Sequence, residues 1–280
     1  MKYNKSNIKI IRPLNCLITF CTIVLAGFIC SNFVEYKIII VAGFTGALGN
    51  AAGNIINDYF DIEIDKINRP QRVLPSGNLS PTFALNIYVT ITYFSILLAF
   101  YNLNSNAIAI IIITTVMMFL YSYKLKKIVF VGNVVIAFFT GLAFLFGSVV
   151  VENIYCGIIP TVFAFLISLM RELVKDIEDI KGDKAANIKT YPIKYGVGAT
   201  VKLISITGIV LIISTTVPFL LKIYNLYYFI FVSIFVNTTI VYVITRLNQS
   251  TSLNTISKMS KLLKIGMIFG IIAILIGTKL

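Results

Sequence analysis

Apolar runs of about 20 residues recur along the whole chain, and they limit its fold more than any other feature. A helix needs about 20 such residues to cross roughly 30 Å of hydrocarbon. Hydrophobic residues make up 58% of the sequence and charged residues only 12%, whereas about 25% of residues are charged in a soluble domain. The pattern lacks the alternation of a β-barrel. The sequence therefore predicts an all-α integral membrane protein.

Polar or Gly/Pro-containing breaks divide the chain into nine predicted spans. Their ranges are 13–33, 37–57, 81–101, 106–122, 129–150, 154–174, 197–220, 225–245 and 262–279. The basic N-terminal segment followed by an apolar run also resembles a signal peptide. That run is too long and lacks a small-residue cleavage site, so we expect it to be the first span. We expect one transmembrane domain over residues 1–280.

Lys and Arg concentrate in the segments that would be cytoplasmic if the N-terminus lies inside. Residues 1–12, 58–80, 122–128, 171–202 and 246–264 hold 4, 3, 3, 7 and 4 of them, which is 21 of the 24. By the positive-inside rule, this favours a multi-pass protein of the cell membrane with a cytoplasmic N-terminus. The net charge of +13 then reflects topology and attraction to anionic lipid headgroups, and it requires no nucleic acid partner.

The residues that the chain lacks exclude several kinds of chemistry. It has no histidine, which excludes His-ligated haem, His-based zinc sites and Ser-His or Cys-His nucleophiles. Its four cysteines, Cys16, Cys21, Cys30 and Cys156, fall within or beside apolar spans and form no CxxC pair. We therefore expect neither a cysteine metal site nor a disulfide. Carboxylates, amides, tyrosines and basic side chains must carry the chemistry.

Nine of the eleven carboxylates occupy two short stretches, each at the inner end of a predicted span. Asp58, Asp61 and Asp65 have the spacing i, i+3, i+7, and so do Asp176, Asp179 and Asp183. Asn57, Asp61 and Asp65 form a further ridge at i, i+4, i+8, whereas the spacing of Glu63 directs it elsewhere. These spacings place several oxygen ligands on one helix face in each stretch.

Clustered carboxylates near a bilayer repel one another, and a divalent cation offsets that cost. Mg²⁺ takes oxygen ligands, keeps several waters and is usually held by one or two carboxylates together with substrate phosphates. Two Asp-rich faces across a cavity would thus hold Mg²⁺ ions that bridge a diphosphate. Two alternatives remain open: a solvated loop whose acids pair with lysines, and a cation pathway, which would place acids at mid-membrane.

Basic and aromatic residues follow the acids and are candidates for contacts with phosphate oxygens. They are Arg12, Arg69, Arg72, Lys124, Lys126 and Lys127, with Tyr121 and Tyr123 beside the lysines. Arg offers a fork that fits phosphate oxygens, and Lys a compact charge. The positive-inside rule by itself accounts for any one of these basic residues. Arg69 and Arg72 are better candidates for phosphate contacts, because they directly follow the acidic face.

These motifs resemble those of the UbiA superfamily of intramembrane prenyltransferases. Its NxxxDxxxD signature is present as Asn57, Asp61 and Asp65, and its DxxxD signature as Asp179 and Asp183, with Asp176 one turn earlier. The segments "NRPQR", "YSYKLKK" and "RELVKDIEDIKGD" are also similar. The resemblance implies a nine-helix bundle around a central cavity. It also implies Mg²⁺-dependent transfer of a prenyl group from an isoprenyl diphosphate to a lipid or aromatic acceptor.

The resemblance further assigns roles to individual residues. It implies that Asn57, Asp61, Asp65, Asp179 and Asp183 hold the Mg²⁺-diphosphate, with Asp58 and Asp176 as helpers. It implies that Arg69 and a lysine of 124–127 contact diphosphate oxygens, and that Tyr121 or Tyr123 lines the site.

Within the superfamily, the sequence is most similar to archaeal members that transfer a geranylgeranyl group to geranylgeranylglyceryl phosphate in ether-lipid biosynthesis. That resemblance implies a membrane-lipid acceptor that carries a phosphate. Arg12, Arg72 and the lysines of 124–127 exceed the need of one diphosphate, which is consistent with a second cationic pocket. Two alternatives stay open: prenylation of a hydroxybenzoate or naphthoate acceptor in quinone biosynthesis, and a cation-coupled membrane transporter.

Overall fold

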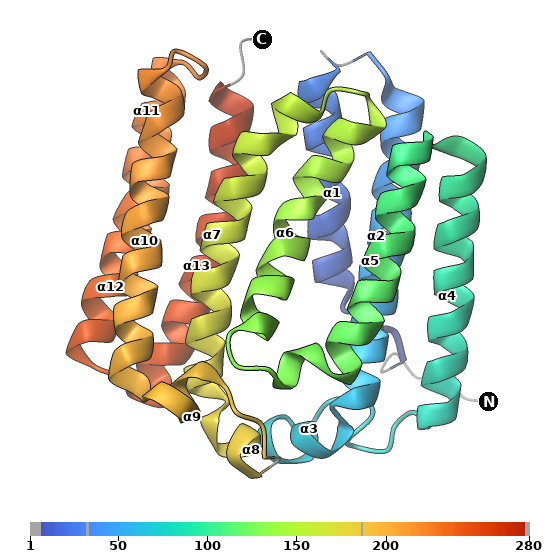
Figure 1. Cartoon of the computed structure of the whole chain (residues 1–280), viewed down its shortest axis with the longest axis vertical. Helices are drawn as coiled ribbons and strands as arrows, with labels where there is room; N and C mark the ends of the chain where they lie inside the picture. Colours follow the sequence, from blue (N-terminus) through green and yellow to red (C-terminus); the bar gives the residue numbers. More distant parts are fainter. Residues whose placement is uncertain (1–6, 32–33, 186, 278–280) are drawn as a thin grey trace. The chain divides into compact units, whose positions relative to one another are not determined.

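The computed structural model describes residues 7–31, 34–185 and 187–277, which are nearly all helical and include no strand. The long helices are α1 (Pro13–Cys30), α2 (Tyr36–Phe60), α4 (Pro81–Asn102), α5 (Ser105–Tyr123), α6 (Val131–Val150), α7 (Ile154–Glu178), α10 (Val197–Leu220), α12 (Thr238–Gln249) and α13 (Leu253–Gly277). The short helices are α3 (Ile62–Asn68), α8 (Ile180–Ala185), α9 (Tyr191–Tyr195) and α11 (Leu226–Phe231). The other helical elements of the described residues are two 3₁₀ turns, η1 (Asn7–Ile11) and η2 (Leu125–Lys127), and a π-helix, η3 (Val232–Asn237). Figure 1 shows the arrangement of the helices within the chain.

Nine helical segments in the described ranges are long and apolar enough to cross a membrane, which confirms the predicted fold class. Several run past their predicted ends. The second and sixth spans continue to Phe60 and Glu178, and the ninth begins at Leu253 instead of residue 262. Lys258 and Lys261 lie in the first turns of α13, so hydropathy alone placed its start too late. Helix geometry thus continues beyond the apolar stretch and carries polar residues at the ends.

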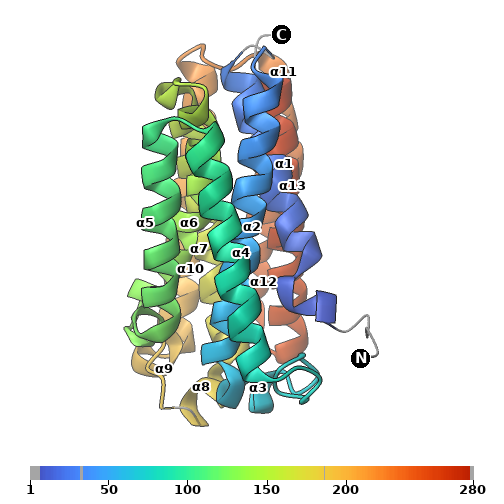
Figure 2. The same ribbon diagram turned by 90° about the vertical axis from the view of Figure 1, so that its right-hand side faces the viewer.

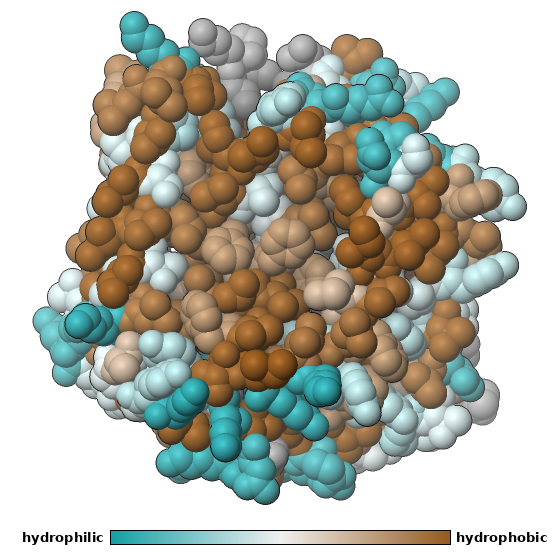
Figure 3. All heavy atoms as spheres, viewed as in Figure 1, coloured by the Kyte–Doolittle hydropathy of each residue, from teal (hydrophilic) through white to brown (hydrophobic). Residues whose placement is uncertain are grey.

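The surface of the helices suits a lipid environment. On α5, for example, Ile113 and Val116 are 61% and 53% exposed. Figure 3 shows hydrophobic residues over the middle of the helices and hydrophilic residues gathered at the end where α3 and α8 lie. Side chains of this kind are stable at the surface when hydrocarbon surrounds the helices.

The chain forms two compact units. The first unit comprises Met1–Lys127, Ala143–Gly157 and Lys181–Ile188, and the second comprises Ile128–Leu142, Ile158–Ile180 and Lys189–Leu280. The single domain over residues 1–280 and the central cavity that the family resemblance implies stay predictions.

Helix α2 is the centre of the first unit and packs against α1, α4 and α5 (Figure 2). Small residues permit this close approach, because a Cβ on Gly43 would lie 2.7 Å from Val24 and 2.8 Å from Phe20 of α1. Small residues are typical of helix interfaces in membranes, where apolar burial alone gives little driving force. The polar end of α2 is thereby held beside the start of α1.

A disulfide joins Cys30, at the C-terminal end of α1, to Cys156, in the first turns of α7. The expectation that the cysteines form no disulfide is therefore wrong. The two residues are 126 positions apart in sequence, so spacing gave no sign that they meet. Cys16 and Cys21 are free thiols.

In the second unit, α12 packs against α10 and α13. Tyr228 of α11 is fully buried, and its hydroxyl donates to the Thr215 carbonyl at 2.9 Å. Asn225 caps α11 and its amide donates to the Ile276 carbonyl at 2.9 Å, which ties α11 to the end of α13.

Candidate active site

The first aspartate motif lies where α2 ends and α3 begins. Asp61 is the junction residue, with φ −98° and ψ 5°, so Asp58 and Asp65 belong to two helices. The prediction of one continuous helix face is wrong in this detail. Hydrogen bonds of the i, i+4 type nevertheless cross the junction, from Asp61 N to Asn57 O at 3.0 Å and from Asp65 N to Asp61 O at 2.8 Å. They keep the ridge of Asn57, Asp61 and Asp65 together.

Asp61 is held by a lysine that is remote in sequence. Lys126 Nζ of η2 lies 2.5 Å from Asp61 Oδ1, and the Asn57 amide donates to Asp61 Oδ2 at 2.9 Å. The Lys126 side chain is only 8% exposed. Lys124 and Lys127 are exposed, so the structure singles out Lys126 among the three predicted lysines.

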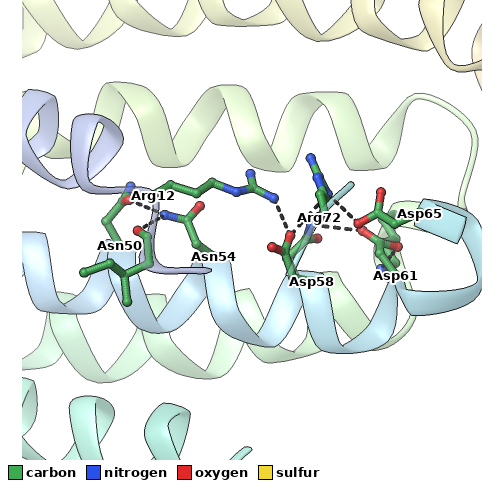
Figure 4. A network of polar contacts seen from close by, with 10 residues as sticks. Arg12, Asn50, Asn54, Asp58, Asp61, Asp65 and Arg72 are labelled. Atoms are coloured by element: carbon green, nitrogen blue, oxygen red, sulfur yellow. Dashed lines mark hydrogen bonds and ion pairs between the residues drawn. The ribbon is translucent and has the colours of Figure 1, made fainter. Parts of the chain in front are cut away.

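Asp58 and Asp65 are bound by arginines (Figure 4). Arg72 Nη1 lies 2.5 Å from Asp65 Oδ2 and 3.2 Å from Asp58 Oδ1, and Arg12 Nη2 also donates to Asp58 Oδ1. Buried Val73 and Leu74 anchor the loop that carries Arg72. Three carboxylates and three cations therefore form one network at the polar end of the first unit.

Burial raises the pKa of Asp65, because its carboxylate loses contact with water. Arg72 acts in the opposite direction, by its charge and its hydrogen bond, and the neighbouring Asp61 and Asp58 raise the pKa further. Protonation of Asp65 is therefore sensitive to Arg72.

The oxygens of the first motif fit a divalent cation. Asn57 Oδ1 is buried and has no hydrogen-bond partner among the residues that the structure describes, while the same side chain donates to Asp61. A buried carbonyl oxygen without a partner is costly, and a hard cation beside Asp61 would satisfy it. No three His, Cys, Asp or Glu side chains form a metal-binding group within the described ranges. Mg²⁺ held with a diphosphate needs only one or two protein carboxylates.

The second motif has the same local design. Asp179 follows the last residue of α7 and precedes α8, and its N–H donates to the Lys175 carbonyl at 2.9 Å. Each motif thus places an aspartate at the junction of a long helix and a short one. Asp176 accepts a hydrogen bond from Asn133 at 2.9 Å within the second unit.

Asp183 belongs to the first unit and is buried in α8. Figures 1 and 2 show α3 and α8 at the same end. They are in contact there, since a Cβ on Gly182 would lie 2.2 Å from the amide atoms of Asn68. The structure thus brings Asp183 to the end of the unit that carries the first motif. Asp176 and Asp179 belong to the other unit, and their joint action with the first motif stays a prediction.

The remaining predicted residues have varied surroundings. Arg69 is the C-cap of α3, and its N–H donates to the Asp65 carbonyl at 2.8 Å. Tyr123 is 57% exposed, and its ring packs against Phe60 and Phe119. Tyr121 is partly buried. Their roles toward a substrate stay predictions. Glu63 is directed away from the motif as expected, with an 80% exposed side chain paired to Lys66.

Sequence reasoning missed the amides that extend the network into the apolar part of α2. Asn54 Nδ2 donates to Asn50 Oδ1 at 2.9 Å and to the Ile11 carbonyl at 3.1 Å. Asn50, Asn54 and Asp58 recur every four residues, and that periodicity could have identified them.

Comparisons with known proteins agree with this architecture. The model of the UbiA prenyltransferase family matches residues 16–268. The digeranylgeranylglyceryl phosphate synthase of Methanosphaera stadtmanae is 36% identical over 272 residues, which cover 96% of this chain and 98% of that protein. A solved structure of a digeranylgeranylglyceryl phosphate synthase is similar over 99% of both chains, with a TM-score of 0.80 and 33% identity. A UbiA homologue of Archaeoglobus fulgidus, bound to DMAPP and Mg²⁺, is 15% identical and shares the fold, with a TM-score of 0.69 over 98% of this chain and 100% of that one.

Proposed function

The chain belongs to the UbiA prenyltransferase family, and on that premise we propose that it makes digeranylgeranylglyceryl phosphate. It transfers a geranylgeranyl group from geranylgeranyl diphosphate to the free hydroxyl of geranylgeranylglyceryl phosphate. The second ether bond of an archaeal membrane lipid is formed in this way. Similarity to synthases of this name over nearly the full length supports the acceptor assignment.

The observation that carries the proposal is the network at the α2–α3 junction. Asp61 and Asp65 are oxygen ligands directly beside Lys126 and Arg72, which are suited to phosphate oxygens. Asn57, Asp61 and Asp65 would hold Mg²⁺, and the mixed set of carboxylates and cations would hold the diphosphate. The UbiA homologue bound to DMAPP and Mg²⁺ supports this use of the fold. By sequence motif, Asp179 and Asp183 would complete the set.

The reaction breaks the bond between the allylic C1 and the diphosphate oxygen and forms a bond from C1 to the acceptor oxygen. Mg²⁺ held by Asn57, Asp61 and Asp65 would supply positive charge to stabilise the departing diphosphate. Lys126 adds to that stabilisation when it turns from Asp61 to the diphosphate. The diphosphate leaves with the electron pair, and the acceptor hydroxyl gives its proton to the departing diphosphate as its oxygen attacks C1. A membrane environment keeps water from the allylic cation.

We further propose that the aspartate end faces the cytoplasm. The distribution of Lys and Arg supports this orientation. The disulfide supports it independently, because Cys30 lies at the far end of α1 from Arg12, and disulfides persist on the oxidising side of a membrane.

The test is product identification with purified protein. Geranylgeranyl diphosphate and Mg²⁺ would be supplied with either geranylgeranylglyceryl phosphate or 4-hydroxybenzoate, and products analysed by mass spectrometry. We expect digeranylgeranylglyceryl phosphate, one diphosphate released per product, and no turnover in EDTA. Prenylation of the hydroxybenzoate alone would favour the quinone pathway, and absence of diphosphate release would favour a transporter.

A further inference from the structure

Two guanidinium groups converge on one carboxylate oxygen. Arg12 Nη2 and Arg72 Nη1 both donate to Asp58 Oδ1, and Figure 4 shows the two side chains pointing toward Asp58 from either side. Two guanidiniums provide more donors than one oxygen can accept. A phosphate monoester has three terminal oxygens and matches paired arginines better than a carboxylate does.

The backbone around Arg12 is arranged to present this side chain. Arg12 has φ 53° and ψ 70°, a left-handed conformation that is unfavourable for a residue other than glycine. The preceding residue is held in place by two side chains. Asn54 of α2 donates to the Ile11 carbonyl at 3.1 Å, and Cys16 of α1 donates to the same carbonyl. A strained conformation held in place by neighbouring side chains is a feature of ligand-binding positions.

The surroundings fit the head of an amphipathic lipid. The side chains of Arg12 and Arg72 are 29% and 22% exposed, whereas that of Asp58 is 7% exposed, so both arginine side chains are partly accessible. Leu14 and Leu17 follow on α1 and are 61% and 57% exposed. A lipid phosphate at Arg12 would therefore have apolar surface next to it for its chain. The N-terminus of the 18-residue helix α1 adds a partial positive charge at the same place.

We propose that Arg12 and Arg72 form the subsite for the phosphate monoester of the acceptor lipid, and that Asp58 occupies their donors when the acceptor is absent. This inference rests on the proposed function. It separates the acceptor phosphate from the donor diphosphate, which is assigned to Asp61, Asp65 and Lys126. Asp58 thus competes with the acceptor phosphate for the same two guanidiniums.

The test is equilibrium binding of geranylgeranylglyceryl phosphate to purified protein without Mg²⁺ or donor, with its phosphate-free alcohol as the comparison ligand. Arg12→Met removes charge-assisted hydrogen bonds and should weaken binding of the phosphate by about 10- to 100-fold. It should leave binding of the alcohol within about twofold of wild type. Asp58→Asn removes the competitor and should tighten phosphate binding by about three- to tenfold. Inorganic phosphate in excess should compete weakly, since it lacks the lipid chain.

Lys9→Met is the matched control, because Lys9 is exposed in η1 and its loss removes one positive charge three residues from Arg12. It should change binding by less than about twofold. Thermal unfolding of each variant checks that the protein is folded. Arg12→Lys keeps the positive charge but loses the paired donors of the guanidinium. It should recover only part of the affinity for the acceptor phosphate.

Besides unchanged acceptor affinity in Arg12→Met, two results would overturn the subsite. One is that Asp58→Asn weakens binding of the acceptor phosphate as Arg12→Met does. Both variants would then act only by breaking a structural ion pair. The other is loss of affinity for geranylgeranyl diphosphate with Mg²⁺, and not for the acceptor, in Arg12→Met. The turnover assay separates this failure from that of the proposed function. Wild-type protein that forms the product while Arg12→Met keeps its acceptor affinity and acceptor KM contradicts only the subsite.

Discussion

Individual side chains at the α2–α3 junction are neutralised by partners that are far away in sequence. Asp61 pairs with Lys126 and Asp58 with Arg12, at separations of 65 and 46 residues. Each of these carboxylates therefore forms an ion pair with a basic side chain. The site holds both the ligands for Mg²⁺ and the cations for phosphate in one network, so removing either kind of residue has a distinct consequence.

Replacement of Asp61 by Ala should reduce Mg²⁺-dependent prenyl transfer by at least about 100-fold, because it removes a charged ligand next to the unpaired Asn57 Oδ1. Steady-state assays with geranylgeranyl diphosphate would measure the loss. Glu63→Ala is the matched control, since Glu63 is exposed and pairs with Lys66. It should retain activity within about twofold. Full activity of Asp61→Ala in folded protein would contradict the site.

The pH dependence of metal binding should respond to Arg72. Burial raises the pKa of Asp65 and Arg72 lowers it, and Mg²⁺ binds the ionised carboxylate. Metal affinity should therefore decrease as the pH falls through the pKa of Asp65. In Arg72→Gln that pKa rises further, so the midpoint of the decrease should move to higher pH.

Binding of Mn²⁺, followed by EPR between pH 5 and pH 8, would measure this midpoint. Lys66→Gln removes a cation that pairs with the exposed Glu63 in the described part of the chain, and it should leave the midpoint unchanged. A midpoint that moves to lower pH in Arg72→Gln is the contrary result.

At the scale of helices, the sequence predicted the spans and the motif spacing well, because both depend on local periodicity. It did not predict the breaks at Asp61 and Asp179, since both stretches keep a helical spacing across the junction. It also could not select Lys126 from three neighbouring lysines, or pair Cys30 with Cys156. Those features depend on how distant segments pack, which periodicity does not describe.

The contact between α3 and α8 depends on Gly182, which has no side chain. In Gly182→Ala, the new Cβ would overlap the Asn68 amide, so the Asn68 side chain must move away and α8, which carries Asp183, loses this contact with α3. We expect transfer activity to fall by about tenfold or more with a smaller change in stability. Gly198→Ala is the control, because a Cβ there meets nothing within 4 Å. Adding Asn68→Ala to Gly182→Ala should restore part of the activity, and no restoration would contradict the packing argument.

The disulfide acts at the other end of α1, about 27 Å from Arg12 by the length of the helix. Cys30→Ser with Cys156→Ser should lower the Tm by about 5–10 °C and leave transfer activity within about twofold. Reduction of wild-type protein should give the same shift in Tm, and reduction of the double variant should give none. Cys16→Ser is the control, because Cys16 is a free thiol.

For the whole molecule, the orientation in the membrane determines which compartment supplies the substrates. In protein with Cys16 and Cys21 replaced by Ser, Lys127→Cys and Leu221→Cys would each introduce one exposed thiol. A membrane-impermeant maleimide should label Leu221→Cys in intact cells and Lys127→Cys only after permeabilisation. The reverse pattern would place the aspartate end outside.

The bond between Cys30 and Cys156 also changes the connectivity of the chain. It closes residues 30–156 into a covalent ring with two tails. Asp58, Asp61, Asp65, Arg72 and Lys126 all lie on the ring, whereas Arg12 lies on one tail and Asp183 on the other. A single proteolytic cut anywhere in the ring would leave one covalent molecule until the bond is reduced. The ring thus keeps the carboxylates and their nearest cations joined even when one of the loops between them is broken.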